Sequence, residues 1–287
     1  METLREVLAR AQREGVAVGH FNVSEPAALK AIVAAARDLK LPVMIGVSEG
    51  EREFVGVPQV AALVKSYREE SPYPIFLNAD HTHSLEKAEQ AARAGFDEII
   101  FDGSSLPFEE NVTQTKKAVE LIKSINPECL VEGEIGYIGS SSDVVDKAPE
   151  GIGSMTTPEE AKDFVAATGI DILAPAVGNM HGLLQSMVSG EVQKRLDIER
   201  IAAIRDASGI FMTLHGGSGT NDDDFRKAIR AGMTIIHVNT EIRLAWRRAM
   251  EAALASEQSV VPYKLLVHVV AAIQKVVDAR LRLFCSR

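Results

Sequence analysis

Six of the seven histidines lie within predicted strands or directly after them, and only His268 lies in a predicted helix. Imidazole is a common zinc ligand, and a zinc site often has three protein ligands and one open position. One histidine in apolar surroundings is more often structural, whereas several on one rim favour a metal site. There is no short motif such as HExxH, so the fold must bring the ligands together. The six are His20, His81, His83, His181, His215 and His237.

A carboxylate and two loops accompany these histidines. Asp80 directly precedes His81, where it either caps a turn or acts as a general acid/base. Residues 215–219 (His-Gly-Gly-Ser-Gly) follow the seventh predicted strand, and residues 238–241 (Val-Asn-Thr-Glu) follow the eighth and open a helix. Most glycine-rich loops are only tight turns, but in barrels the loops at these two places often bind phosphate. A metal beside a phosphate site suggests a Lewis acid that acts on a phosphorylated substrate.

The elements that must position these side chains alternate along the chain. Short apolar runs, several of them apolar on both faces as in buried parallel strands, alternate with segments of helical period. Eight such units favour an α/β fold, the (β/α)8 TIM barrel, over an open α/β sheet, whose usual GxGxxG after the first strand is absent. The predicted strands are Val16–Asn22, Pro42–Val47, Ile75–Ala79, Glu98–Asp102, Cys129–Gly133, Asp171–Ala176, Ile210–Leu214 and Thr234–Val238.

Capping residues mark several of the helices between these strands. Ser84, Thr157 and Asn221 stand at the N-cap positions of three of them. The amphipathic segment Thr3–Arg13 precedes the first strand, and we expect it to cap the bottom of the barrel. The segment Val261–Phe284 is a helical extension beyond the eighth unit. Residues 1–287 are therefore expected to form a single barrel domain.

The composition excludes several classes of protein. The chain has 287 residues, of which 46% are hydrophobic and 25% charged, so global disorder is excluded. Cys129 and Cys285 are too few for a disulfide scaffold and fit a reducing compartment. A net charge of −9 without a basic block and the lack of a membrane-length apolar run argue against nucleic acid and membrane as partners and predict a cytoplasmic protein. No lysine falls in a predicted strand, which disfavours imine chemistry.

Taken in order, short motifs along nearly the whole chain resemble the class II, zinc-dependent ketose-bisphosphate aldolases, the family that includes fructose-1,6-bisphosphate aldolase. Each motif is short, but their order and spacing together are specific. The motifs are Gly19-His20-Phe21-Asn22, Gly46–Gly50, Asp80-His81, Phe108–Val112, Val131–Gly136, His181-Gly182, His215–Gly219 and Val238–Glu241.

The resemblance implies a reaction and its catalytic groups. The reaction is reversible aldol cleavage of fructose 1,6-bisphosphate to dihydroxyacetone phosphate and glyceraldehyde 3-phosphate, with Zn²⁺ as cofactor. His81, His181 and His215 would hold the zinc, and Asp80 would exchange a proton with the C4 oxygen. The family also implies a homodimer or homotetramer.

Further positions follow from the same resemblance. Asp102 and Glu134 match carboxylates near an alternative metal position. A monovalent cation, Na⁺ or K⁺, is implied near Gly182 and the loop after the seventh strand. The positions that match substrate-binding residues are Asn22, Ser48, Gly182, Gly216, Gly217, Ser218, Asn239 and Thr240.

Three departures from the family pattern bear on activity. The acidic residue that protonates the enediolate is replaced by serine in the loop 140–142, which leaves Asp143 as the substitute. His237 stands where the family has a substrate-binding asparagine, and an imidazole is bulkier and titrates near neutral pH. The C-terminal stretch 262–270 lacks the arginine that binds the second phosphate of a neighbouring subunit's substrate, so the clamp would come from Lys264 or from elsewhere, for example Arg52.

These departures keep other functions open. Tagatose 1,6-bisphosphate or another ketose phosphate is an alternative substrate. A non-catalytic barrel that binds a sugar phosphate is a second alternative. A metal-dependent hydrolase is a third, although the usual HxH on the first strand is absent because His20 stands alone.

Overall fold

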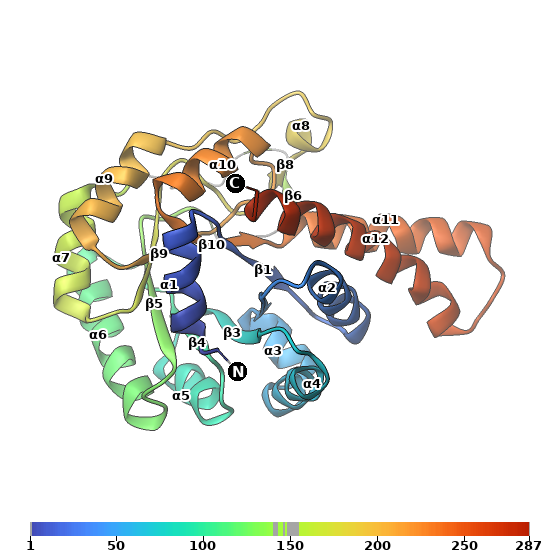
Figure 1. Ribbon diagram of the computed structural model, residues 1–287, viewed down its shortest axis with the longest axis horizontal. Coiled ribbons are helices and arrows are strands. Elements are labelled where there is room, and N and C mark those ends of the chain that lie inside the picture. The colour runs from blue at the N-terminus through green and yellow to red at the C-terminus, as the bar shows by residue number, and fades with distance from the viewer. Residues whose placement is uncertain (1, 140–142, 146, 148–154, 287) are drawn as a thin grey trace.

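The computed structural model describes residues 2–139, 143–145, 147 and 155–286, and its centre is a closed parallel barrel (Figure 1). Around the barrel the described strands follow the order β1-β10-β9-β7-β5-β4-β3-β2. The predicted TIM barrel is confirmed, and the open sheet is wrong because β1 pairs with both β2 and β10. The strands are β1 (Val18–Asn22), β2 (Val43–Val47), β3 (Ile75–Thr82), β4 (Glu98–Phe101), β5 (Leu130–Ile135), β7 (Ile172–Pro175), β9 (Phe211–Leu214) and β10 (Met233–Val238).

Each barrel strand overlaps one predicted apolar run, since a strand covered on both faces must be apolar on both. β3 differs in length: it continues beyond Ala79 to Thr82 and so includes Asp80 and His81. Its register against β4 shifts between Ala79 and Thr82, and His81 has a φ of 40°. Such a bulge changes the direction in which side chains point, and it occurs often beside active sites.

The helices lie on the outside of the barrel (Figure 1). Ser84, Thr157 and Asn221 cap three of them with their side chains, as predicted. The helices between the strands are α2 (Pro26–Leu39), α3 (Glu49–Val55), α4 (Val57–Glu70), α5 (Leu85–Arg93), α6 (Phe108–Ile125), α7 (Pro158–Thr168), α8 (Gln185–Val188), α9 (Ile198–Ser208) and α10 (Asp222–Ala231). Outside the barrel, two short strands pair in parallel: β6 (Val144–Val145) and β8 (Leu183–Leu184).

The N-terminal helix α1 (Leu4–Glu14) closes one end of the barrel, as expected. Its buried face packs against apolar side chains from the amino ends of six strands, and these side chains form a core separate from the larger one between barrel and helices. Thr3 and Glu6 form a capping box that begins the helix. The members of this smaller core are Leu4, Val7, Leu8, Ala11, Val18, Met44, Phe76, Leu130, Ile172 and Ile235.

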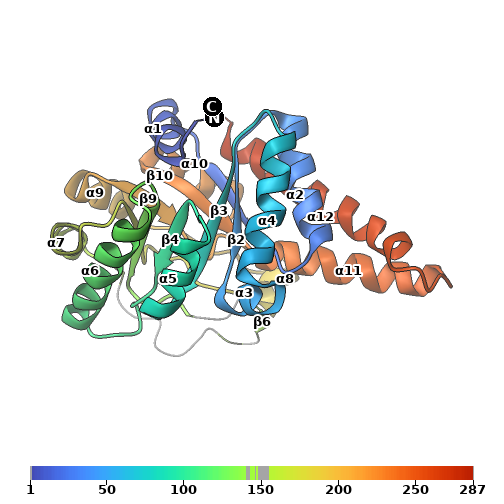
Figure 2. The ribbon, with the colours of Figure 1, turned by 90° about the horizontal axis from the view of Figure 1, so that it is seen from below.

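The last two helices form an arm. α11 (Thr240–Ser256) and α12 (Pro262–Phe284) pack against each other and extend away from the barrel in both views (Figures 1 and 2). α12 then runs back along α2, and its last residue, Phe284, accepts a backbone hydrogen bond from Ala17 at 3.0 Å. The predicted C-terminal helical extension is confirmed. In the described chain, none of the helices has both the length and the apolar character needed to span a bilayer.

The two ends of the barrel differ. Figure 2 shows α1 and both termini at one end, with β6, α3 and α8 at the opposite end. Parallel strands all finish at the same end, so side chains at their carboxyl ends come together there. The β6–β8 pair and α8 belong to this end.

Candidate functional site

A cavity at the carboxyl ends of the strands brings together most of the residues selected from the sequence. Their side chains or backbones come from β1, β3 and β10 and from the loops after β7, β9 and β10. Its lining residues are Asn22, Asp80, His81, His181, Gly182, Gly216, Ser218, His237, Asn239 and Thr240. A neighbouring outer cavity of about 320 Å³ shares Asp80, His81, His181 and Asn239 with it, and its lining also includes Ser48, Asp102 and Arg243.

Three of the histidines face one another across this cavity. Selected ring nitrogens of His81, His181 and His215 all lie within 4.8 Å of one another. Each imidazole also has one nitrogen next to an oxygen acceptor. His81 Nδ1 lies 2.8 Å from Asp102 Oδ2, and His181 Nδ1 lies 2.5 Å from the carbonyl oxygen of Gly139.

His215 follows the same pattern with the opposite nitrogen. Its Nε2 lies 2.7 Å from Glu132 Oε1, so its Nδ1 faces the centre and lies 3.1 Å from His81 Nε2. Histidines that hold a metal usually donate their other N–H to a carboxylate or carbonyl, which fixes the tautomer and the ring orientation. All three imidazoles therefore have the orientation of metal ligands.

The charges around the trio favour a single positive centre. Burial disfavours a charged imidazole, but Asp80, Asp102 and Glu134 outweigh it and raise the pKa of His81 well above its ordinary value. Burial and the neighbouring His81 lower the pKa of His181 and of His215 to about 3. The charged form is therefore favoured for only one of the three rings, that of His81.

Buried polar atoms without a hydrogen-bond partner among the described residues also surround this centre. Glu134 Oε2 is one of them and lies 3.5 Å from Nδ1 of both His81 and His215. Asp80 Oδ1 and His237 Nε2 are two others. Three imidazoles with oriented donors and nearby carboxylates fit a divalent ion with mixed nitrogen and oxygen preference, such as Zn²⁺.

Asp102 and Glu134, the two carboxylates predicted near an alternative metal position, form a second possible ligand group with His81. His81, Asp102 and Glu134 offer donor atoms that all lie within 4.8 Å of one another. Burial and Asp102 raise the pKa of Glu134 well above its ordinary value. Both groups share His81, so the ring can serve either position.

Asp80 is buried beside the trio and kept ionised. Its Oδ2 accepts a hydrogen bond of 2.8 Å from Asn22, and its Oδ1 lies 3.6 Å from His237 Nδ1. Burial alone would raise the pKa of Asp80, but His81 and His237 hold it well below its usual range. An ionised, buried carboxylate with an exposed cavity on one side can accept a proton from a bound hydroxyl.

His237 stacks between two other histidines. Its ring lies 3.4 Å from that of His20 with an interplanar angle of 5°, and 4.2 Å from that of His215. Burial and the neighbouring His20 lower the pKa of His237, so the ring is neutral. Because its ring is neutral and stacked, a histidine at position 237 can lie beside His215 without charge repulsion.

A buried polar layer supports the site from within the barrel. His20 Nε2 lies 2.9 Å from Asn78 Oδ1, and Asn78 donates to Glu98 at 3.0 Å. Thr213 donates to Glu132, the residue that orients His215. Burial and Glu132 raise the pKa of Glu98 well above its ordinary value, so the two carboxyls need not both be charged.

The glycines after β9 are required by close backbone contacts. A Cβ on Gly216, whose φ is 60°, would lie 2.3 Å from the carbonyl oxygen of Met180. A Cβ on Gly217 would lie 2.6 Å from that of His237, to which the Gly217 N–H also donates. Ser218 Oγ accepts from the backbone N–H of Glu241 at 3.3 Å, so the loop is joined to the first turn of α11. A helix N-terminus beside a glycine loop is suited to bind an anion.

The two residues named as possible phosphate clamps, Arg52 and Lys264, lie in different parts of the structure. Arg52 as the clamp is wrong, because its side chain is buried and donates to Val47 O, Asp80 O and Thr82 Oγ1. Lys264 lies at the start of α12, at the outer end of the arm. Arg243 lines the outer cavity instead and donates to Glu51 at 2.9 Å.

The loop that departs from the family pattern is only partly described. Residues 140–142 lie outside the described residues. Asp143 is exposed, and its carbonyl oxygen accepts the N–H of Leu183 at 3.0 Å. Asp143 is therefore next to Gly182 along the rim but does not line the cavity itself.

Sequence reasoning missed three residues that support the site. Glu132 orients His215, and its signal was an acidic residue inside an otherwise apolar strand. Glu51 accepts from both Asn22 and the backbone N–H of Ser48, and it forms a capping box at α3. Lys194 lies in an irregular segment, which carries no pattern that would have selected it.

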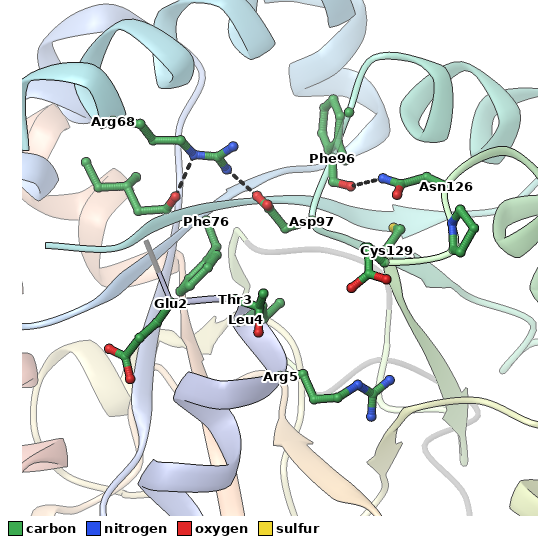
Figure 3. A pocket seen from close by; sticks show the side chains of 14 residues that line it. Glu2, Thr3, Leu4, Arg5, Arg68, Phe76, Phe96, Asp97, Asn126 and Cys129 are labelled. Atoms are coloured by element: carbon green, nitrogen blue, oxygen red, sulfur yellow. Dashed lines mark hydrogen bonds and ion pairs between the residues drawn. The ribbon is translucent and has the colours of Figure 1, made fainter.

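A larger hollow lies at the other end of the barrel, beside α1 (Figure 3). Its polar groups are engaged with each other: Arg68 pairs with Asp97, and Asn126 donates to the carbonyl oxygen of Phe96. Figure 3 shows Arg5 pointing along the same hollow, and Arg5 pairs with Asp171. These pairs stabilise the closed end and leave the chemistry to the opposite rim.

Comparison with known proteins agrees with this geometry. Residues 2–287 match the model of the family described as fructose-bisphosphate aldolase class-II. The chain is 36% identical to the fructose-bisphosphate aldolase of Geobacillus stearothermophilus over 99% of this chain and 96% of that protein. It is 33% identical to the fructose-bisphosphate aldolase of Staphylococcus aureus strain Mu50, over 98% of this chain and 96% of that protein.

Solved structures give the same result for the fold. The crystal structure of the YdjI aldolase from Escherichia coli K12 superposes with a TM-score of 0.83 at 28% identity, covering 98% of this chain and 96% of that one. The fructose-bisphosphate aldolase of Campylobacter jejuni superposes with a TM-score of 0.79, covering 98% of this chain and 93% of that one. At 19% identity this likeness supports the fold alone.

Proposed function

The chain belongs to the class II fructose-bisphosphate aldolase family, a family of aldehyde-lyases, and on that premise we propose that it cleaves fructose 1,6-bisphosphate reversibly to dihydroxyacetone phosphate and glyceraldehyde 3-phosphate. The observation that carries the proposal is the convergence of His81, His181 and His215 beside an ionised Asp80, next to the loops after β9 and β10. A zinc ion held by the three imidazoles would act as a Lewis acid on the substrate's ketone oxygen.

The chain's own residues would move the protons. Asp80 would accept the proton of the C4 hydroxyl, which lets the departing aldehyde form its carbonyl as the C3–C4 bond breaks. Asn22 holds Asp80 in place through the 2.8 Å hydrogen bond. The remaining carbanion equivalent at C3 needs a proton from a second acid, and Asp143 on the rim is the candidate for that step.

Binding of the two halves of the substrate would be divided between the two cavities. The phosphate of the dihydroxyacetone phosphate half would bind the backbone of Gly216–Ser218 and the first turn of α11, with Gly182, Asn239 and Thr240 around it. The aldehyde half would extend into the outer cavity, where Ser48 and Arg243 lie. A guanidinium there suits a second phosphate and makes a bisphosphate the favoured class.

The decisive experiment is a coupled assay of triose phosphate formation from fructose 1,6-bisphosphate, with added zinc and with a chelator. Zinc-dependent cleavage supports the proposal. Cleavage of tagatose 1,6-bisphosphate or a ketose 1-phosphate in its place would change the substrate within the same chemistry. Binding of dihydroxyacetone phosphate by zinc-loaded protein without any turnover would favour a binding barrel, to which the histidine at 237 gives some support.

Arg243→Met separates bisphosphate from monophosphate recognition. If Arg243 binds the second phosphate, the variant loses about tenfold to a hundredfold in kcat/KM for the bisphosphate and little for fructose 1-phosphate. Equal losses on both would remove Arg243 from this role. Arg247→Met is a control, because this arginine lies one turn further along α11 and pairs with Glu251 on the exposed face.

We also propose that the arm formed by α11 and α12 contacts a second copy of the chain, as a homodimer or homotetramer. Large apolar side chains on it are exposed, with Val260 at 91% and Tyr263 at 73%. Sedimentation of the wild-type chain and of Val260→Asp would test this. A cytoplasmic location stays a prediction.

A further inference from the structure

Lys194 has surroundings unlike those of the exposed lysines. It lies between α8 and α9 with only 4% of its surface exposed. Its ammonium group lies 2.6 Å from the carbonyl oxygen of Met180, 2.7 Å from that of Gly182 and 2.9 Å from that of Gly216. Burial lowers the pKa of Lys194 to about 7, and the charge of Glu241 opposes that shift. Within the described residues, the salt bridges do not include Lys194, and its ammonium group contacts three backbone carbonyl oxygens.

The three carbonyls match the charged form of the side chain. An ammonium group has three N–H donors and no acceptor, so each oxygen receives one hydrogen bond. A neutral amine has two donors and a lone pair, and the lone pair would face the third oxygen. Backbone carbonyls that converge on one compact positive charge are the arrangement by which proteins hold small cations.

Each of these carbonyls belongs to a peptide group whose N–H is also engaged. Because the N–H and C=O of a trans peptide point in opposite directions, fixing one fixes the other. The N–H of His181 donates to Ile138 at 2.9 Å, that of Leu183 to Asp143 at 3.0 Å and that of Gly217 to His237 at 3.1 Å. The ammonium therefore sets three peptide groups. Two of them join the segment after β7 to the segment after β5, and the third joins the loop after β9 to strand β10.

The same lysine is anchored by its own backbone. Its N–H donates to the carbonyl oxygen of Gly219 at 3.1 Å, and it forms an isolated parallel bridge with Thr220. Lys194 is thus attached to the glycine loop after β9 twice, through its backbone N–H and through its ammonium group. That loop adjoins Gly216 and Ser218, which line the inner cavity.

We propose that Lys194 is a positioning residue whose ammonium occupies the place of a monovalent cation between the loops after β7 and β9 and holds the backbone that receives the substrate phosphate. The inference rests on the proposed function for the identity of that phosphate. A tethered ammonium needs no ion from solution, because its local concentration is set by the chain. The family resemblance implies a monovalent cation near Gly182. In this chain the ammonium of Lys194 would take its place, so neither Na⁺ nor K⁺ would be a cofactor.

The test compares monovalent cations on zinc-loaded wild-type protein and on Lys194→Met. At constant ionic strength, K⁺, Na⁺ and NH₄⁺ each replace tetramethylammonium, which is too large to fit between three carbonyls. Wild-type kcat/KM is expected to change less than about twofold among the four salts. Lys194→Met is expected to lose about tenfold or more in tetramethylammonium, mainly through KM, and to recover at least half of that loss in K⁺ or NH₄⁺. Lys227→Met, which removes an exposed lysine paired with Asp223 on α10, should behave as the wild type in every salt.

A second measurement does not depend on turnover. The thermal midpoint of Lys194→Met should rise in K⁺ or NH₄⁺ relative to tetramethylammonium, with no such rise for the wild type, since an ion that binds only the folded chain stabilises it. Lys194→Gln, which keeps polar character, replaces the methionine variant if that one fails to fold. Activation of the wild type by K⁺, or a variant whose midpoint and KM respond equally to all four salts, overturns the proposal. If the wild type cleaves no ketose phosphate, the proposed function fails, whereas the thermal midpoints still decide the role of Lys194.

Discussion

Replacing Asp80 by asparagine tests the proposed proton transfer. The amide has the size of the carboxylate, and its oxygen can keep the 2.8 Å hydrogen bond from Asn22. The carboxylate's other oxygen lies 3.7 Å from His81 Nε2 and 3.6 Å from His237 Nδ1, so no close contact is forced by the added N–H₂ group. The substitution therefore removes the base and its charge while the packing stays.

The expected size of the effect follows from this difference. A positioned general base contributes about 10²–10⁴ to the rate, so kcat of Asp80→Asn should fall by that factor, about 2.7–5.5 kcal/mol in activation free energy. The hydrogen bond from Asn22 changes from charge-assisted to neutral, which costs about 1–2 kcal/mol in the free energy of unfolding. For a chain of this size the thermal midpoint should fall by about 2–8 °C.

Two measurements on the same preparation separate these effects. Triose phosphate formation is followed in the coupled assay at saturating substrate, and zinc content and dihydroxyacetone phosphate affinity are measured on the variant. Asp97→Asn is the matched control, because Asp97 is a partly buried carboxylate at the closed end of the barrel, paired with Arg68. Its variant should lose stability and keep kcat. A loss of less than about tenfold in kcat for Asp80→Asn, with zinc and ligand still bound, would refute the assignment of Asp80 as the base.

Four other changes have expected outcomes. A zinc chelator should abolish cleavage and lower the thermal midpoint, and added zinc should restore both, because the three imidazoles would lose the cation that we propose they share. Activity in protein shown to be free of metal would contradict this. His237→Asn removes two ring stacks and should cost about 1–3 kcal/mol in the free energy of unfolding measured by urea titration, while an unchanged midpoint would show that the stacks contribute nothing. Arg52→Met leaves buried acceptors on β2 and β3 without a donor and should cost about 3 kcal/mol or more; a selective loss of bisphosphate binding without destabilisation would return Arg52 to the clamp role. Burial raises the pKa of Cys285 to about 11. Its reaction with a disulfide reagent at pH 8 should therefore be about a hundredfold slower than that of free cysteine. A rate near that of the free thiol would show that the C-terminus of α12 opens.

The barrel and the gathering of histidines at one rim were predictable because the strands carry a strong local signal. A strand buried on two faces must be apolar along its whole length, and all parallel strands finish at one rim. Residues at the ends of β3 and β9 and after β7, although far apart in sequence, therefore had to meet. Topology placed the histidines at one rim, whereas the choice of His81, His181 and His215 as the trio came from the family resemblance.

What sequence could not supply is the contact of one side chain with a distant backbone. The direction of Arg52 depends on three acceptors from β2 and β3, which no spacing reveals. Lys194 lies in a segment without periodicity, and its partners are carbonyls from two other loops. The choice of nitrogen in His215, opposite to that in His81 and His181, depends on where Glu132 stands in the barrel interior.

The pairing of β1 with β10 joins the first strand of the barrel to the last. His20 and His237 are partners in that register, and their rings stack at 3.4 Å. Contacts of such long sequence separation form slowly during folding, because the chain must order nearly all of its length before it gains them. Asp80 and the three proposed metal ligands reach their final geometry only when this seam closes. The capture of zinc during refolding should therefore mark closure of the barrel, and a fragment that ends before β10 should show neither the site nor the cooperative unfolding of the whole chain.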